Sequence, residues 1–218
     1  MRATLILLAC AAAPLSPHDV ISTKITWSRE ISRLVYARCV ACHRDGGATF
    51  SLETYTAARP WAKAIRDEVL CRRMPPWGAV RGFGRFSGDV SLSQEEMDTI
   101  AQWVEGGAPE GDPALLPKVP PGTQSCFLTA PAGRLTPVHG AVRLERETVA
   151  IAIRPAGDVL DSARVVAILP DSSIIPMLWL YQYRRAYGHE FVYRAPLRLP
   201  AGTRIESQPP IMFTLITR

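Results

Sequence analysis

The sequence predicts a multidomain α + β chain, with a helical N-terminal part and an antiparallel β-sandwich in the C-terminal part. In the first half, apolar residues recur at helical spacing between turn-forming residues. In the second half, short runs of apolar and β-branched residues alternate with Pro, Gly and Asp turns. Between the halves, residues 106–124 are dense in Pro and Gly, which neither continue a helix nor pack as a central strand.

Composition agrees with two small domains. The chain has 218 residues, of which 47% are hydrophobic, and this is enough for a core in each half. The net charge is +5, but the Arg residues are spread through both halves without basic clusters or interleaved aromatic residues. Nucleic-acid binding is therefore not expected. A mildly positive face would suit an acidic redox partner, although scattered solvated charge explains the composition more simply.

The N-terminus predicts an export signal over residues 1–16. Arg2 supplies one positive charge, and a short apolar run over residues 5–13 follows it. This run is too short to span a bilayer. Cys10 follows Leu-Leu-Ala, which is also typical of a lipoprotein processing site, where Cys10 would carry a lipid anchor. We expect an exported protein, either periplasmic or lipid-anchored and facing the periplasm.

Three helices are expected in the first half. The first covers residues 28–38, where apolar residues recur at helical spacing. The second opens at Pro60, a residue favoured in the first helical turn, and continues to residue 70. The third follows a capping-box sequence, Ser-Gln-Glu-Glu, at residues 93–96 and stops at Gly106.

Residues 39–43 read Cys-Val-Ala-Cys-His, the C-x-x-C-H spacing required for covalent attachment of a c-type haem. Cys39 and Cys42 would form thioethers with the haem vinyl groups, and His43 would be the proximal iron ligand. The alternatives are a chance match, a thioredoxin-like redox dithiol and half of a zinc site. A redox dithiol needs a strand-to-helix junction, and four-ligand zinc needs a second pair of ligands, but the sequence predicts neither. The predicted cofactor is one covalently attached haem c.

The distal iron ligand has four candidates, Met74, Met97, His18 and Cys71. Met74 precedes two prolines, which would stiffen an extended loop just past the second helix. Met97 lies on the apolar stripe of the third helix, where a core role is more typical. We therefore predict His43 and Met74 as the two axial ligands. Such ligation raises the reduction potential and leaves no open position for a substrate.

Five stretches carry a resemblance to a known family: residues 39–43, 50–52, 58–65, 73–77 and 92–109. Through them, residues 28 to about 116 resemble a monohaem c-type cytochrome domain of exported bacterial proteins. The resemblance implies an N-terminal all-α cytochrome c domain over residues 24–112. In such proteins the domain often precedes a β-sandwich similar to the C-terminal domain of copper type II, ascorbate-dependent monooxygenases. Here that sandwich would cover residues 125–218, after a linker at 113–124.

Strands in the second half are expected in five short β-rich runs: residues 141–145, 149–153, 165–169, 190–193 and 204–206. Antiparallel pairing is expected throughout. The strand, turn and strand over residues 195–206 look like a segment near the end of the monooxygenase-like sandwich.

The copper chemistry of the monooxygenases is not expected in this chain. A mononuclear copper site would need two closely spaced His residues and a thioether. Here His139 stands alone in the sequence, while His189, Met177 and Met212 are scattered. A lone His is more often a surface residue or a hydrogen-bonded core residue. Met177 is expected in the core of the sandwich.

Two further cysteines have no role in the haem motif. Cys71 precedes the proposed ligand loop, and Cys126 opens the β part. A disulfide between them is chemically permitted in an oxidising compartment, and buried free thiols are the other alternative.

The tryptophans of the first half also allow two interpretations. Trp61 and Trp77 flank the ligand region, where they would either shield the haem or pack in the core. Trp103 is expected to close the third helix against the first.

The predicted function is one-electron transfer by an exported c-type cytochrome, with a periplasmic or membrane-associated redox protein as its partner. Whether the chain is also an enzyme stays open. In one alternative, the haem feeds electrons to a β domain that binds copper or a small substrate. In the other, the haem part is a sensing or interaction module whose β domain binds a partner.

Overall fold

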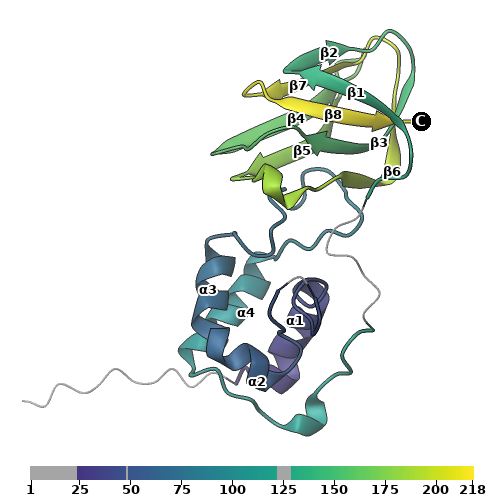
Figure 1. Cartoon of the computed structure of the whole chain (residues 1–218). Helices are drawn as coiled ribbons and strands as arrows, with labels where there is room; N and C mark the ends of the chain where they lie inside the picture. Colours follow the sequence, from purple (N-terminus) through teal and green to yellow (C-terminus); the bar gives the residue numbers. More distant parts are fainter. Residues whose placement is uncertain (1–23, 48, 122–128) are drawn as a thin grey trace, which may run out of the picture.

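The computed structural model describes residues 24–47, 49–121 and 129–218, which form a helical part and two β-sheets (Figure 1). The helical elements are η1 (Trp27–Ile31), α1 (Ser32–Arg38), α2 (Tyr55–Ala58), η2 (Arg59–Trp61), α3 (Ala62–Leu70), α4 (Gln94–Glu105), η3 (Pro113–Leu115) and η4 (Arg185–Tyr187). The strands are β1 (Arg134–His139), β2 (Ala141–Arg143), β3 (Thr148–Pro155), β4 (Ser162–Ile168), β5 (Ile174–Tyr181), β6 (Phe191–Leu199), β7 (Arg204–Gln208) and β8 (Met212–Thr217).

The predicted fold class, a multidomain α + β chain with an N-terminal all-α cytochrome c domain, is wrong. The structure is mostly β, with two four-stranded antiparallel sheets in the orders β1-β8-β3-β6 and β2-β7-β4-β5. The α-helices are short, and α4, the longest among the described residues, has 12 residues. The first half of the chain also does not bury its apolar residues in one helical core, because Trp77, Ala79 and Phe86 are buried in the core of the sheets.

The physical reason for this correction lies in residues 71–93, the segment between α3 and α4. Its prolines and glycines disfavour a helix, and its aromatic side chains Trp77 and Phe86 are buried among residues of the strands. Instead, Ala79 forms a β-bridge with Leu180 and Phe86 forms one with Tyr193. The segment is therefore shared between the helical part and the sheets.

The helices have their own core, and the caps that start them are visible in the sequence. At the start of η1, the Thr26 hydroxyl accepts a hydrogen bond from the Arg29 amide, while the Thr26 amide donates to Glu30. The predicted capping box at Ser93 is confirmed, since its hydroxyl accepts from the Glu96 amide and its amide donates to Glu96. These caps orient the helices around a core that contains the following buried side chains: Trp27, Ile31, Val35, Val40, Met97, Ile100 and Trp103.

Glu96 also joins α4 to the rest of the molecule. Its carboxylate accepts two hydrogen bonds from Arg38 at the end of α1, at 2.9 and 3.2 Å, and lies 3.3 Å from Arg81 in the shared segment. Burial alone would raise the pKa of Glu96, but the bonds from the Ser93 amide and Arg38, with the nearby charges of Arg38 and Arg81, hold it below its ordinary value of 4.5.

We expect Glu96→Gln to destabilise the fold by about 1–3 kcal/mol at neutral pH, because hydrogen bonds to a charged acceptor are lost. The pKa of Glu96 is lower in the folded state, so its contribution is complete above pH 4.5 and is lost as the pH falls through the folded-state pKa. The variant should therefore lose less stability than the wild type on acidification. Urea unfolding at pH 7 and pH 3.5 measures both effects. Glu95→Gln, on the exposed side of the same helical turn, is the control, and an equal loss in both variants would contradict the prediction.

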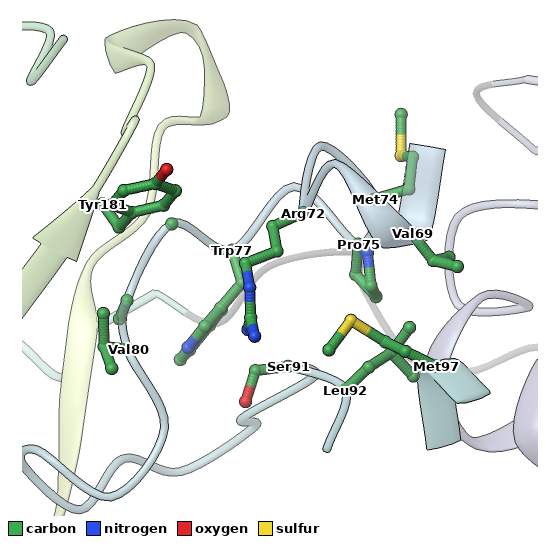
Figure 2. A pocket seen from close by; sticks show the side chains of 12 residues that line it. Val69, Arg72, Met74, Pro75, Trp77, Val80, Ser91, Leu92, Met97 and Tyr181 are labelled. Atoms are coloured by element: carbon green, nitrogen blue, oxygen red, sulfur yellow. The ribbon is translucent and has the colours of Figure 1, made fainter. Parts of the chain in front are cut away.

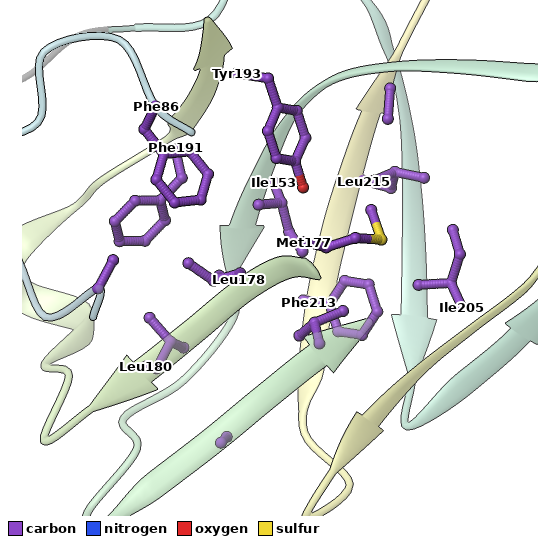
Figure 3. Packing of buried hydrophobic residues seen from close by; sticks show 14 of the residues in the cluster. Phe86, Ile153, Met177, Leu178, Leu180, Phe191, Tyr193, Ile205, Phe213 and Leu215 are labelled. Carbon is purple, nitrogen blue, oxygen red and sulfur yellow. The ribbon is translucent and has the colours of Figure 1, made fainter. Parts of the chain in front are cut away.

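The two sheets pack face to face around an apolar core. Figure 3 shows Met177 and Leu178 of β5 lying close to Ile153 of β3 and Phe213 of β8, so both sheets contribute to it. Met177 is completely buried, which confirms its predicted core position. Alternate residues of β4 and β7 are buried, as expected for strands with one face toward the core.

All five expected runs overlap strands, namely β2, β3, β4, β6 and β7. Strands β1 and β5 contain Pro137 and Pro176, which weaken the sequence signal for a strand, and β8 was also not predicted. The segment 195–206 does contain two strands and a turn. However, β6 and β7 lie in different sheets, so the turn crosses from one sheet to the other.

Several predictions concern residues outside the described ranges. These include the signal peptide over residues 1–16, the lipid anchor at Cys10, the candidate ligand His18 and the cysteine Cys126. The predicted domain limits, including the linker at 113–124, stay predictions. Within the described residues, no helix has the length and apolar character needed to cross a membrane.

Candidate cofactor site

A cavity of about 470 Å³ brings together all four predicted site residues, Cys39, Cys42, His43 and Met74. Its volume falls in the range of small-molecule and cofactor sites, about 300–1,000 Å³. The rest of its wall is largely apolar and includes Phe50, Leu52, Trp61, Ala64, Ile65, Val69, Pro75, Pro76 and Val90. The C-x-x-C-H loop, α3 and the Met74 loop (residues 71–77) thus surround one apolar space.

The end of α1 fixes the position of the two cysteines. The helix ends at Arg38, and the amides of Cys39 and Val40 both donate to the Val35 carbonyl, at 2.8 and 3.0 Å. The next turn is closed by the amides of Cys42 and His43, which both donate to the Cys39 carbonyl. Because Val40 is completely buried in the helical core, the loop is held from behind while its cysteines line the cavity.

The surroundings of Cys39 do not favour a redox dithiol. Burial raises the pKa of the Cys39 thiol to about 12, although the Arg38 charge opposes this effect. The thiol also lies at the C-terminal end of a helix, where the helix dipole disfavours an anion. Reactive dithiols need a lowered thiol pKa, whereas a thioether sulfur is neutral and suits an apolar wall. Within the described residues, no group of three His, Cys, Asp or Glu side chains is placed to hold a metal ion.

His43 is oriented by a backbone carbonyl. Its Nδ1 lies 3.1 Å from the Phe50 carbonyl oxygen, which can only accept, so Nδ1–H donates and Nε2 is left with its lone pair. Burial lowers the pKa of His43, while the hydrogen bond to Phe50 acts in the opposite direction, and the net result favours the neutral ring. A neutral imidazole with its second nitrogen held by a carbonyl is the usual arrangement of a metal-binding His.

An aromatic pair covers the His43 side of the cavity. The Phe50 ring meets the His43 ring edge-on at 4.8 Å between centroids and stacks on Trp61 at 4.4 Å. Trp61 is 44% exposed, so the pair forms part of the outer rim of the cavity. Of the two tryptophans predicted to flank the ligand region, Trp61 therefore lines the cavity, while Trp77 packs in the core of the sheets.

Met74 is held on a loop that folds back onto α3. The amides of Arg73 and Met74 both donate to the Glu68 carbonyl, at 2.9 and 3.2 Å, and the Arg73 guanidinium makes two 2.8 Å bonds to the Glu68 carboxylate. The Met74 side chain lines the cavity and is 40% exposed. Met74 therefore lies outside the buried cores and at the wall of the cavity.

A second cavity, of about 270 Å³, lies on the other side of the Met74 loop, toward β5 (Figure 2). It shares Val69, Met74 and Pro75 with the first cavity, and Met97 lines only the second one. In Figure 2, Met74 and Met97 lie on opposite sides of Pro75. Met97 is therefore not placed as a ligand beside His43. Cys71 is exposed and lines neither cavity, so the alternative of a buried thiol is wrong for this residue. Whether it pairs with Cys126 stays open, because Cys126 lies outside the described residues.

The residues weighed for copper lie at three separate places. His139 and Met212 are cross-strand partners on β1 and β8, and Met212 is exposed. Met177 is in the core between the sheets, and His189 is buried against Pro76 in the Met74 loop. No two His residues of the described chain therefore share a site with a buried thioether.

The position of His189 beside the Met74 loop was not predicted from the sequence, where His189 was weighed only as a copper ligand. Its Nε2–H donates a hydrogen bond to the Pro76 carbonyl, two residues after Met74. The two residues are separated by 113 positions, and no local pattern in the sequence marks the contact. The only signal is composition, since His189 lies in a run rich in aromatic residues.

Comparison with protein-family models, with curated proteins and with solved structures finds no match for this chain. The resemblance to c-type cytochromes and to the monooxygenase-like sandwich therefore stays a prediction carried by the residues quoted for it.

Proposed function

We propose that the protein is an exported electron carrier that holds one haem c, with thioethers at Cys39 and Cys42 and with His43 and Met74 as axial ligands. The observation that best supports this proposal is the apolar cavity that collects these four side chains. They come from two separate stretches of the sequence, and only the fold places them around one space.

A haem bound in this cavity would supply one-electron chemistry between Fe(II) and Fe(III). The chain itself would hold the haem, orient its ligands and shield it from water. Cys39 and Cys42 would anchor the group to a loop fixed on α1, and the bond from His43 Nδ1 to the Phe50 carbonyl leaves Nε2 as the atom that would bind iron. The Met74 thioether would raise the reduction potential relative to a second imidazole.

The walls of the cavity would also raise the reduction potential. Side chains such as Leu52, Ile65 and Val69 exclude water, and a low-polarity surrounding disfavours the more highly charged oxidised centre. The stacked pair of Phe50 and Trp61 covers part of the open rim. This arrangement suits transfer to a periplasmic or membrane-associated redox protein rather than conversion of a substrate at the metal.

The ultraviolet–visible spectrum of the purified protein, oxidised and reduced, tests the proposal. A reduced α-band typical of thioether-linked haem is expected, together with a weak band at the red edge of the oxidised spectrum from the Met sulfur. Protein purified after export in a host that matures c-type cytochromes, but without covalent haem, would refute the proposal.

Met74→Ala is expected to abolish the weak red band while leaving the haem attached, because only the distal thioether is removed. Met97→Ala is the matched control, since Met97 lies in the second cavity. It should keep the band even though a buried side chain is lost. Persistence of the band in Met74→Ala, or its loss in Met97→Ala alone, would show that Met74 is not the ligand.

A further inference from the structure

The β-sheets hold the stretch of chain that follows Met74, and this attachment indicates their role. The Met74 loop is the first part of the shared segment, and its Trp77 is buried in the core of the sheets. The Val80 amide donates to the Trp179 carbonyl at 2.7 Å, and the Tyr181 amide donates to the Gly78 carbonyl at 2.9 Å. The chain just after Met74 is therefore attached to β5 by backbone hydrogen bonds.

The attachment extends along β6. The Ser87 amide donates to the Val192 carbonyl, and Arg194 donates from its backbone amide to Arg85 and from its side-chain Nε to the Phe86 carbonyl, each bond measuring 2.8 Å. Two strands of different sheets thus hold the same segment, so its position depends on the packing of the sheets against each other.

His189 contacts the chain two residues from Met74. It precedes β6, its side chain is 1% exposed, and its Nε2–H donates to the Pro76 carbonyl. Its ring lies 5.0 Å from Trp77 and 5.5 Å from Phe191, so its orientation is fixed by aromatic packing. The carbonyl that it binds belongs to Pro76, which lines the first cavity beside Met74.

We propose that the β-sheets act as a clamp on the Met74 loop and that His189 is a positioning residue for Met74, acting through Pro76. This inference rests on the proposed haem site. A flexible loop would hold a thioether ligand only at the expense of the conformational entropy lost on ligation. The clamp fixes the backbone two residues from the ligand beforehand, so that less freedom is lost when the thioether binds.

Competition with free imidazole measures how firmly Met74 is held, because imidazole binds at the sixth position only when the thioether leaves. In His189→Leu, which fills the site without a donor, the apparent affinity for imidazole should rise about tenfold, the equivalent of one lost hydrogen bond to a carbonyl left unpaired. His189→Gln keeps an N–H donor and should lie between the wild type and His189→Leu. His139→Leu, an exposed position on β1, should equal the wild type.

A second variant keeps the test decisive if His189→Leu does not fold. Arg194→Gln removes the side-chain bond to the Phe86 carbonyl and leaves the backbone bond to Arg85 in place. We expect a smaller increase in imidazole affinity, about threefold, because this bond lies farther from Met74.

The results separate the two proposals. Wild-type protein without covalent haem or without the red band would refute the haem site itself. Wild-type protein with both features, but with imidazole affinities for the His189 and Arg194 variants equal to that of His139→Leu, would overturn the clamp alone. Graded affinities in the order His189→Leu, His189→Gln, wild type would support it.

Discussion

Replacing Cys39 and Cys42 together with alanine is expected to abolish covalent haem attachment. Both thiols line the cavity, and no other cysteine of the described chain does so. Thioether formation needs a thiol at each vinyl group, so the double variant has no anchoring atom left. Denaturing electrophoresis followed by haem staining measures the effect. The wild-type band should stain, and the band of the double variant should lose its stain completely.

Single variants and a matched control sharpen this result. Cys39→Ala and Cys42→Ala each keep one thiol, so each should retain stain at a reduced level. Cys71→Ala removes an exposed thiol outside the cavity and should stain like the wild type. A double variant that still stains after denaturation would show that haem is attached elsewhere or that the pentapeptide has another role.

Trp103→Ala is expected to destabilise the helical part by about 3–5 kcal/mol, the range for truncating a buried aromatic side chain. Trp103 is completely buried in the helical core, with its ring 6.1 Å from Trp27. Its Nε1–H also donates to the Pro109 carbonyl at 3.0 Å, which holds the chain leaving α4 against the core. Urea unfolding followed by circular dichroism at 222 nm, which reports mainly on the helices, measures the loss.

Two further variants separate packing from hydrogen bonding at this position. Trp103→Phe keeps most of the ring but loses the N–H donor, and a loss of about 1–2 kcal/mol is expected. Trp61→Ala removes the same type of side chain from an exposed position and should lower stability by less than about 1 kcal/mol. Equal losses for Trp103→Ala and Trp61→Ala would contradict the assignment of Trp103 to the helical core.

The local features of the site were accessible from the sequence because they depend on near neighbours. The pentapeptide at 39–43 is one turn closed by its own backbone, and the capping box at 93–96 is closed by its own side chains. The expected strands likewise follow alternation within a few residues. In each case, the interactions that decide the structure lie within about five positions along the chain.

The features that the sequence did not reveal depend on distant contacts. The fold class was wrong because Trp77 and Phe86 follow a helix in sequence but pack with Phe191 of β6. The bond between His189 and Pro76 has the same origin, since its partners are far apart in the chain. Periodicity within a window carries no information about such pairs, and each of them is decided by the packing of the whole core.

The place of β8 in its sheet has a consequence for the order of events during maturation. Strand β8 lies between β1 and β3 in its sheet, yet it follows the other seven described strands along the chain. The C-x-x-C-H loop, by contrast, is held by residues 35–52, which leave the ribosome early. The sheet that includes β6 is complete only after β8 has joined it. If the proposed haem is attached at Cys39 and Cys42, these cysteines would therefore be available before the strands fix the Met74 loop.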